Sequence, residues 1–337
     1  MSFNVQSDFS KGAVKNMYDY SIEAMQYAKT QEKWPEIFEE KDIDGDHWQE
    51  TSVIGPKMLR KTGQAEGFQV TLAREGYTVY AAVFDYTDAI TMNYDTVRDI
   101  KKFKNILREC ANGWGEGAII TRDQFYARVF NKGGFTAGDW IFNGTPESGA
   151  QSDASGDGCY DSASTSALVA PFCRTGDTYK HTSKVGGTSY YNALASGTVN
   201  AASIVNLINL VEVTNAYDER DVKIPITVDA IVYPQGQWET IGRILDSDKI
   251  AGLSTNDTNA GLKRKFKTRV EWAQLTDTDA VFVGVAKKGL VALKRMDPVF
   301  DFFEDKKTRC YWATVEARMG AMFKNFRFWG VDNLAQS

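Results

Sequence analysis

The fold of this chain is decided by the stretch EGFQVTLAREGYTVYAAVF, residues 66–84. Residues 66–72 and 77–84 each have the composition of a strand, and the segment between them predicts a hairpin turn in which Gly76 supplies a positive φ. The second strand is apolar on both faces, which indicates protein contact on both sides. Because an isolated hairpin is only marginally stable in water, we predict that this one rests on a partner surface, in its own chain or in a neighbour's. The predicted contact residues of the hairpin are Phe68, Val70, Leu72, Tyr77, Val79 and Val83.

Length and composition describe a globular protein with an ample core. The chain has 337 residues, of which 43% are hydrophobic and 25% are charged. This length exceeds the usual single-core limit of about 250 residues, so two subdomains are expected. The net charge of −5 argues against a dedicated nucleic-acid binder. No apolar run approaches the roughly 20 residues of a membrane span, and residues 1–12 lack the features of a signal peptide.

The first half of the chain predicts two helices around the hairpin. Ser10 caps a helix that runs to about Thr30, with a charged face opposite the apolar one, so we expect an amphipathic arm that lies on another surface. Its predicted contact residues are Val14, Met17 and Ile22. Residues 31–60 predict irregular structure. A long helix is expected to begin at Thr91 or Asn93, to kink or break at the glycine cluster of residues 113–117, and to end near residue 133.

The second half predicts an α+β arrangement. Residues 144–187 are rich in Gly, Ser, Asp and Thr and predict a long loop, either functional or a family-specific insertion. A helix is expected over 198–213, a strand over 226–232 that ends at Pro234, and then a helix with Ile241, Ile244 and Leu245 inward. Strands are expected over 280–285, 290–293 and 310–329. Helices and strands do not alternate regularly, which excludes a parallel α/β fold.

The residues that usually carry chemistry are sparse. His47 and His181 are the only histidines, and they lie in unrelated loops, so the sequence predicts no His-centred catalytic or zinc site. Residues 42–46, DIDGD, lack the calcium-loop spacing and predict a solvated acidic turn. The basic run KRKFKTR, residues 263–269, predicts an edge strand or loop that forms salt bridges rather than a phosphate site. No catalytic, cofactor-binding or metal-binding residue is predicted.

The four cysteines are widely scattered and lack zinc-type pairing. They are Cys110, Cys159, Cys173 and Cys310. Free thiols are expected, with a Cys159–Cys173 bridge as the alternative.

Four stretches, taken in order, carry a resemblance to a known family. They are YTVYAAVFDYTDAITMNYDTVRD (77–99), YYNALASGTVNAASIVNLINLVEV (190–213), IPITVDAIVYPQGQWETIGRILDS (224–247) and residues 289–330. Together they resemble the major capsid proteins of tailed phages, which have the Hong Kong 97-type fold, and they are most similar to the major head subunit of Mu-like phages. The resemblance implies an N-terminal arm (1–50), an extended hairpin loop (51–86), a peripheral domain (87–200 and 286–337) that contains the loop 144–187, and an axial domain (201–285). The peripheral domain would hold a long spine helix, which the glycine cluster would interrupt.

The function implied by this resemblance is structural. The chain would be the major capsid protein of a tailed bacteriophage, forming the pentamers and hexamers of an icosahedral shell around the DNA genome. It would be made in the bacterial cytoplasm and reside in the virion. Expected partners are scaffold and portal proteins, decoration proteins in some shells, and DNA held without sequence-specific binding, but no membrane, cofactor or metal. Because no scaffolding domain precedes the arm, a separate scaffold or a removed leader is expected.

Two alternative functions remain open. One is an encapsulin-like bacterial nanocompartment shell, which packaged cargo rather than packaged DNA would reveal. The other is an enzyme or carbohydrate-binding module that uses residues 144–187 as its site, against which the scarcity of histidine counts.

Overall fold

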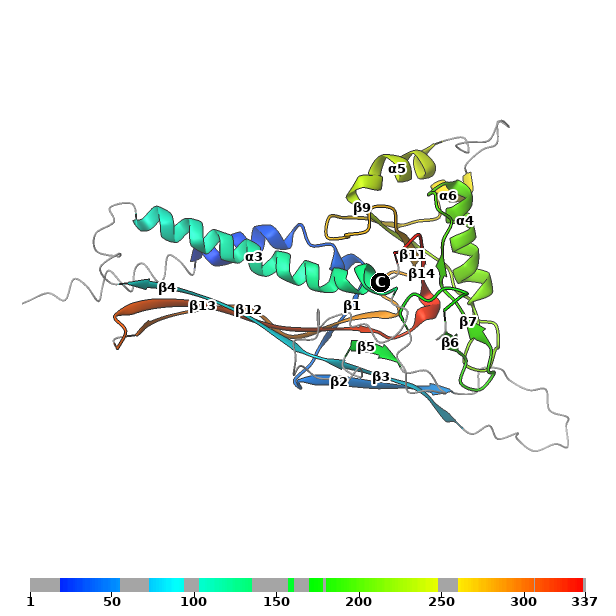
Figure 1. Cartoon of the computed structure of the whole chain (residues 1–337), viewed down its shortest axis with the longest axis horizontal. Coiled ribbons are helices and arrows are strands. Elements are labelled where there is room, and N and C mark those ends of the chain that lie inside the picture. Colours follow the sequence, from blue (N-terminus) through cyan, green and yellow to red (C-terminus); the bar gives the residue numbers. More distant parts are fainter. Residues whose placement is uncertain are drawn as a thin grey trace, which may run out of the picture.

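The structure is a computed structural model, and it describes residues 19–54, 73–93, 103–134, 157–160, 170–177, 180–247, 260–305 and 307–335. These residues form an elongated molecule with a compact body at one end and a long arm at the other (Figure 1). No helix in the described part of the chain combines the length and the apolar composition needed to cross a membrane.

The arm is a four-stranded sheet with the order β1-β12-β13-β4. Its strands are β1 (Glu39–Asp42), β4 (Phe84–Asn93), β12 (Leu290–Asp305) and β13 (Cys310–Phe323). Only β1 runs parallel to its neighbour, and it pairs only with the inner end of β12. Beyond that point β12, β13 and β4 continue as three antiparallel strands toward the tip of the arm.

One face of the arm sheet is covered by α3 (Phe103–Asn131), which runs along the arm as a continuous helix of 29 residues (Figure 1). The rings of Phe84 and Tyr86 on β4 contact the ring of Phe125 on α3, with centroids 6.0 and 5.7 Å apart. A second helix, residues 19–29, lies beside α3 and leads into the 3-10 helix η1 (Trp34–Glu36). The two helices touch at Gly115, where an added Cβ would lie 2.8 Å from the Cβ of Ala24.

The body is built on a five-stranded sheet with the order β10-β9-β11-β14-β8. Its strands are β8 (Ala193–Leu194), β9 (Ala230–Pro234), β10 (Thr268–Trp272), β11 (Val281–Gly284) and β14 (Trp329–Asp332). Residues alternate between its faces: Val232, Phe282 and Val331 pack into a core shared with α3, whereas Ile231 and Val283 pack into a second core. That second core contains α4 (Ala201–Asn209), the π-helical turn η3 (Leu210–Thr214), α5 (Trp238–Asp246) and α6 (Ala260–Lys263).

A three-stranded sheet with the order β2-β3-β5 lies against the inner part of the arm. Its strands are β2 (His47–Ile54), β3 (Arg74–Ala82) and β5 (Asp157–Tyr160). The two sheets lie close together at Gly320 on β13, where an added Cβ would lie 2.7 Å from the carbonyl oxygen of Ala82. A two-stranded sheet of β6 (His181–Thr182) and β7 (Ser189–Tyr190) and the 3-10 helices η4 (Gln235–Gln237) and η5 (Phe326–Phe328) complete the described elements.

The hairpin is where the sequence prediction was wrong. The expected turn at residues 73–76 does not form, because β3 begins at Arg74. β3 pairs antiparallel with β2 and β5, and the strand expected over 66–72 lies outside the described residues. Residues 31–60 are not uniformly irregular either, since β1 and β2 lie within them. Side-chain alternation identifies a strand but not the strand that pairs with it, which depends on the rest of the fold. Here β3 forms its backbone hydrogen bonds with β2.

The predictions for the long helix were also wrong at its start and at its glycines. Thr91 and Asn93 belong to β4, which continues the arm sheet, and the described helix begins at Phe103. The glycines at 113, 115 and 117 neither kink nor break α3. Gly115 is instead the contact point for the helix 19–29, and Gly113 and Gly117 have nothing within 4 Å of an added Cβ. The helix ends at Asn131, close to the predicted stop at 133.

The elements of the second half were predicted well. The helix expected over 198–213 appears as α4 and η3, and Asn200 and Ser203 form a reciprocal capping box at its start. Ile241, Ile244 and Leu245 are buried on α5, as predicted. The strand expected over 226–232 starts later, at Ala230, and ends at Pro234. β12 is much longer than the strand predicted over 290–293, whereas the strand predicted over 310–329 is divided into β13, η5 and the start of β14. β8 and β14 join the body sheet, so the domain boundaries at 200 and 285 do not divide that sheet cleanly.

Candidate subunit-contact surfaces

A buried polar junction joins the N-terminal segment, α3 and the arm. The Arg122 guanidinium on α3 donates to both carboxylate oxygens of Glu32, at 2.6 and 2.8 Å, and to Asp297 on β12 at 3.0 Å. The side chains of Arg122 and Glu32 are only 7% and 1% exposed. The indole of Trp34 also donates to Glu32, at 3.1 Å. An ion pair buried from water is stable only when hydrogen bonds satisfy the charged groups. The junction therefore fixes how the N-terminal segment, α3 and the arm meet.

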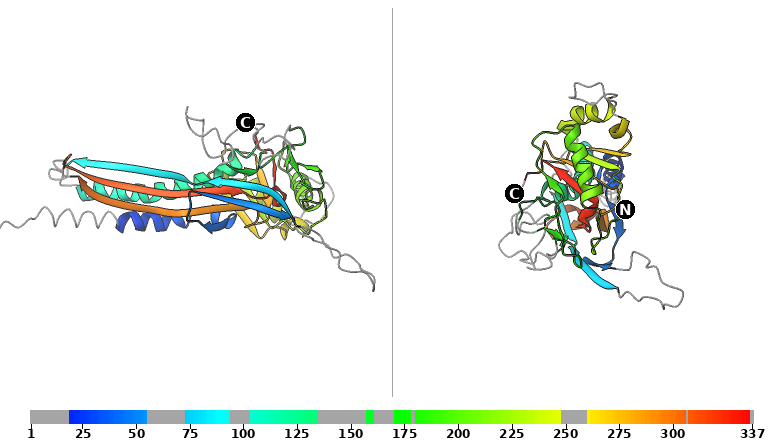
Figure 2. Two further views of the ribbon diagram at one scale, coloured as in Figure 1. Left: turned by 90° about the horizontal axis from the view of Figure 1, so that it is seen from below. Right: turned by 90° about the vertical axis from the view of Figure 1, so that its right-hand side faces the viewer.

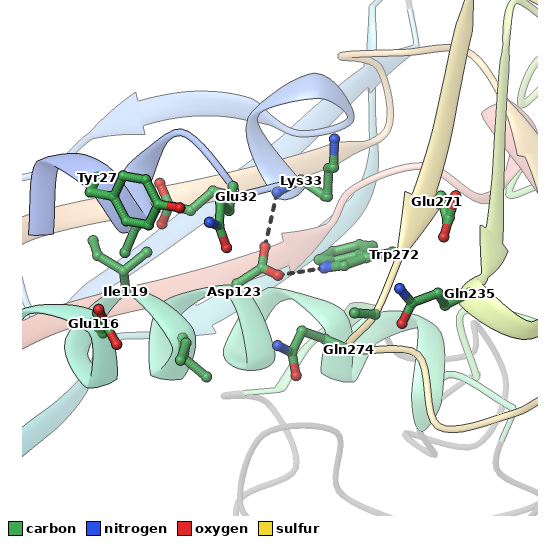
Figure 3. A pocket seen from close by; sticks show the side chains of 14 residues that line it. Tyr27, Glu32, Lys33, Glu116, Ile119, Asp123, Gln235, Glu271, Trp272 and Gln274 are labelled. Atoms are coloured by element: carbon green, nitrogen blue, oxygen red, sulfur yellow. Dashed lines mark hydrogen bonds between the residues drawn. The ribbon is translucent and has the colours of Figure 1, made fainter. Parts of the chain in front are cut away.

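The neighbouring residue on α3, Asp123, links this junction to the body sheet. Its carboxylate accepts from the backbone N–H of Lys33 at 3.1 Å and from the indole of Trp272 on β10 at 2.7 Å (Figure 3). Burial raises the pKa of Asp123, and these two donors partly offset the effect. Two consecutive residues of α3 therefore connect the arm to the body, because Arg122 binds Asp297 on β12 and Asp123 binds Trp272 on β10.

A groove of about 560 Å³ opens beside Asp123. Figure 3 shows Tyr27, Ile119 and Glu116 on one side of it and Glu271, Gln274 and Gln235 on the other. Its carboxylates are spread along its walls, and two of them, Glu32 and Asp123, are already held by the bonds described above. Among the described residues, no group of three or more His, Cys, Asp or Glu side chains is placed to hold a metal ion.

The hairpin of β2 and β3 is tied to the body by polar bonds. The hydroxyl of Tyr77 donates to the carbonyl of Thr182 at 2.7 Å, and Lys184 Nζ donates to the carbonyl of Gly76 at 2.6 Å. Lys324 on the body forms a salt bridge with Glu50 on β2 at 2.5 Å. These bonds anchor the part of the hairpin nearest the body.

The loops that hold the hairpin are themselves organised around Asp221. Its carboxylate accepts from the hydroxyls of Ser183 and Thr188, both at 2.6 Å, and from Tyr190 at 2.8 Å. Burial alone would raise the pKa of Asp221, but these donors outweigh it and hold the pKa below its usual value. Nearby, buried Arg327 donates to Glu219 at 2.7 Å and to the carbonyl of Tyr217. The body therefore presents a rigid support to the hairpin.

The described surface carries several large apolar side chains that no described element covers. Two of them, Val299 (51% exposed) and Phe303 (47%), lie on the outer part of β12, and Val53 (71%) lies at the far end of β2. Trp238 (61%) begins α5 on the body. On the arm, the ring of Phe303 stacks on that of Trp312 in the facing strand, with an interplanar angle of 2°. Exposed aromatic groups of this kind are typical of contact surfaces.

The structure separates the predicted contact residues into three groups. Phe68, Val70, Leu72, Val14 and Met17 lie outside the described residues. Val79 is only 3% exposed and packs in the core of its own chain, which is one of the two surfaces that the sequence left open. Tyr77 and Val83 are half-buried against the same core. Ile22 is half-buried on the helix 19–29, whose Ala24 and Ala28 are buried. This part of the N-terminal helix therefore packs on its own chain.

The basic run at 263–269 forms salt bridges, as predicted. Lys265 pairs with Glu212 at 2.5 Å, and Arg269 pairs with Asp246 at 2.6 Å. Arg269 lies on β10, which is an edge strand of the body sheet.

The cysteines whose side chains are described are free thiols. Cys110 and Cys310 are half-buried, while burial raises the pKa of the Cys173 thiol to about 11. The alternative Cys159–Cys173 bridge is therefore not formed.

Sequence reasoning missed the outer part of the arm. The quoted stretch 289–330 contains Val299, Phe303 and Trp312, but none of the three was predicted as a contact residue. A signal was present, because residues 299–303 are apolar on both faces of a strand, as the hairpin stretch is.

Comparison with known proteins gives no sequence relative: no family model and no curated protein matches the chain. Solved structures do match. A structure from Mycobacterium phage Patience matches with a TM-score of 0.54 at 6% identity, covering 95% of this chain and 87% of the other. The virus-like particle from Pyrococcus furiosus matches with a TM-score of 0.52 at 9% identity, covering 94% and 98%. The capsid of cyanophage P-SCSP1u matches with a TM-score of 0.50 at 10% identity, covering 91% and 89%.

The chain has a Hong Kong 97-type capsid fold. The similarity covers almost the whole chain, so the capsid fold includes both the arm and the body described above. At 6–10% identity it establishes the fold alone. The α+β class and the capsid fold predicted from the sequence are therefore confirmed.

Proposed function

We propose that this chain is the major capsid protein of a tailed bacteriophage, which assembles as pentamers and hexamers into the icosahedral shell that encloses the DNA genome. The observation that carries the proposal is the capsid fold itself, matched over 91–95% of the chain in structures that include a cyanophage capsid and a virus-like particle. In this role the protein acts through assembly rather than catalysis.

The shape of the subunit supports this proposal. A closed shell needs heterologous contacts, in which one part of a subunit meets a different part of the next, repeated around five- and six-fold centres. The arm projects from one end of the body and the strands β2 and β3 run beneath the body (Figure 1), and both parts carry exposed apolar side chains. An elongated subunit with exposed apolar side chains on two separate parts suits heterologous contacts of this kind.

The same proposal assigns roles to the parts of the chain. The helix α3 serves as the spine of the peripheral domain, the hairpin of β2 and β3 as the base of the extended loop, and α4 to α6 with the body sheet as the axial domain. On the four sequence stretches quoted above, we place the chain nearest the Mu-like head subunits. Its partners are then scaffold and portal proteins, decoration proteins in some shells, and DNA held without sequence-specific contacts, in a virion assembled in the bacterial cytoplasm.

Negative-stain electron microscopy of the purified protein, expressed alone and with co-expressed phage scaffold genes, tests this function. We expect closed shells or capsomer rings, and nuclease-protected DNA in particles recovered from infected cells. Particles that contain a bound cargo enzyme and no DNA would identify a nanocompartment shell instead. A protein that stays a compact monomer at high concentration and low salt, with scaffold supplied, would contradict the proposal.

A further inference from the structure

The groove of about 560 Å³ beside Asp123 has no role in the function proposed above. Two of its walls are the helix 19–29 and α3, which lie side by side (Figure 2). The third is β10, with Gln235 of η4 next to it. A volume of this size falls within the range of about 300–1,000 Å³ that is typical of ligand sites. We call it the junction groove, because the N-terminal segment, α3 and the body meet there.

The junction groove has a negative character. Glu116 on α3 and Glu271 on β10 lie on opposite sides of it (Figure 3), and both are exposed. Neither carboxylate pairs with a cation among the described residues. Lys33 is the one cation among the described lining residues, and its Nζ already pairs with Glu36 at 3.3 Å. The groove therefore favours a ligand that brings positive charge to both walls.

The same groove also exposes apolar surface. Tyr27 on the helix 19–29 is 65% exposed, and Ile120 on α3 is 45% exposed. Ala28 and Ile119, which also line the groove, are buried. A small inorganic cation would leave this apolar surface in water. A ligand that carries both cationic and apolar groups would cover it and so gain from its burial.

The edge strand β10 adds backbone groups to one wall of the groove. In its parallel pairing with β9, the backbone N–H of Thr268 donates to the carbonyl of Asp229 at 3.0 Å. Neighbouring residues of a strand direct their N–H and C=O groups to opposite sides, so those of Glu271 point away from β9. Within the described part of the chain, these two groups have no hydrogen-bond partner. A ligand that covers them must supply a donor and an acceptor, which an extended polypeptide does through its backbone.

We propose that the junction groove binds an extended, lysine- or arginine-bearing segment of a different protein. The backbone of this segment pairs with β10 at Glu271, its cationic side chains reach Glu116 and Glu271, and an apolar side chain contacts Tyr27 and Ile120. The source is a different protein because two copies of this chain, each with a net charge of −5, repel each other, whereas a basic partner is attracted. This inference goes beyond the proposed function and does not rest on it, because the whole groove lies within one subunit.

A binding measurement on the free subunit tests the charge contacts. The probe is a fluorescein-labelled peptide of eight residues in which lysine alternates with valine and threonine, and fluorescence anisotropy measures its affinity. Glu116→Gln and Glu271→Gln together should weaken binding at least tenfold, because both charge contacts are lost. The matched control, Glu75→Gln with Glu109→Gln, removes two exposed carboxylates outside the groove and should change the affinity less than twofold. Equal losses for the two double variants, or no binding to the wild type, would overturn the inference.

Methylated forms of the same peptide test the strand pairing. Methylation of one alternate set of backbone amides removes the N–H groups that face β10, whereas methylation of the other set removes those that face away. The charges of the peptide are the same in both forms. The two methylated probes should therefore differ in affinity at least tenfold. Equal affinities would show that the ligand does not pair with β10 and would overturn the inference.

Photo-crosslinking identifies the source of the segment. The photoreactive amino acid p-benzoylphenylalanine replaces Tyr27, or replaces Val213 (51% exposed on η3) as a matched control, in cells that express the chain together with its neighbouring genes. Position 27 should crosslink to a different protein, within a peptide that contains at least two lysine or arginine residues, and position 213 should not. The crosslink should disappear when Glu116→Gln and Glu271→Gln are added.

The outcomes separate this inference from the proposed function. A crosslink from position 27 to a second copy of the chain or to nucleic acid, or no crosslink at all, would overturn the inference and leave the capsid function standing. A chain that forms no shells would overturn the capsid function, but the binding measurements on the free subunit would still decide the inference.

Discussion

At the scale of single residues, the buried Arg122 side chain joins the N-terminal segment, α3 and the arm, so its loss should lower stability more than the loss of an exposed charged side chain. It makes two bonds to Glu32 and one to Asp297, and it is the only cation in contact with the buried Glu32 carboxylate among the bonds described above. Breaking a buried pair leaves an uncompensated charge, whereas losing an exposed pair costs little because water replaces the partner.

The substitution Arg122→Ala should therefore lower the free energy of unfolding of the free subunit by about 3–5 kcal/mol. The matched control is Arg243→Ala, which removes a 2.7 Å salt bridge to Glu239 in which both side chains are about two-thirds exposed. Urea unfolding followed by circular dichroism measures both. A loss for Arg122→Ala no larger than that for Arg243→Ala would show that the junction does not hold the segments together.

His181 predicts how acid affects the subunit. Its ring stacks on Phe326 with centroids 4.0 Å apart, and one ring nitrogen lies 3.2 Å from the carbonyl oxygen of Pro171. Burial, with a smaller contribution from the positive charge of Arg327, lowers the pKa of His181 from 6.5 to about 3. Below pH 6.5, His181 becomes protonated in the unfolded chain but stays neutral in the folded chain. The free energy of unfolding therefore falls as the pH drops toward 3.

The substitution His181→Phe keeps the stacking surface and removes this titration. Between pH 6.5 and pH 4.5 the wild type should lose about 2 kcal/mol more stability than the variant, as judged by urea midpoints at each pH. Carboxylate titrations are common to both proteins and cancel in the comparison. Equal losses would mean that His181 is protonated in the folded subunit.

At the scale of elements, the glycines of α3 do different things within one helix. Gly115 lets the helix 19–29 approach, since a Cβ there would meet the backbone of Ser21 and the side chain of Ala24. Gly113 is exposed and has nothing within 4 Å of an added Cβ. Glycine costs a helix interior about 0.5–1 kcal/mol relative to alanine, so only Gly115 has a packing reason to be retained.

The pair of variants Gly115→Ala and Gly113→Ala tests this distinction. Gly113→Ala should stabilise the free subunit by about 0.5–1 kcal/mol through helix propensity. Gly115→Ala should destabilise it, because overpacking costs about 1–3 kcal/mol and exceeds the gain in propensity. Melting temperatures of the two variants against the wild type give the answer. A stabilised Gly115→Ala protein would mean that the two helices are not in contact.

At the scale of the whole molecule, the body is completed by segments far apart in the sequence. β8 and β14 pair with each other, and β14 pairs with β11, so the sheet draws strands from both sides of residues 201–285. Trp329 on β14 lies against Phe130 of α3, with ring centroids 5.7 Å apart, and its indole donates to the carbonyl of Lys288 at 2.8 Å. Residues 201–285 therefore rely on β14, which lies outside that range.

A fragment of residues 201–285 should consequently lack a cooperative fold, with a weak near-ultraviolet circular dichroism signal and a broad thermal transition. A second fragment joins residues 190–285 through Asn-Gly to residues 328–335, which the antiparallel pairing of Gly284 with Trp329 permits as a two-residue hairpin. We expect this fragment to gain both the near-ultraviolet signal and a sharper transition. Independent folding of 201–285 would support the domain boundaries expected from the sequence.

The sequence alone determined the elements whose signals are local. The helix of α4 and η3 has a capping residue at Asn200 and an apolar stripe at helical spacing, and α5 follows Pro234 with its own stripe. These signals involve residues within one or two turns of each other, so they can be interpreted without knowing what lies opposite. The order of such elements predicted the α+β class, and the resemblance of four sequence stretches to a known family predicted the capsid fold; the solved structures confirm both.

Only the tertiary structure decided which segments meet. The strand predicted from residue 77 onward is present, but it begins at Arg74 where a turn was expected, it pairs with 47–54, and Val79 faces the chain's own core. Gly115 is a helix breaker by propensity, yet here it is the place where a second helix fits. Pairing, burial and close approach depend on residues distant in the sequence, and the free energy of those contacts exceeds the local preference of about 1 kcal/mol or less per residue.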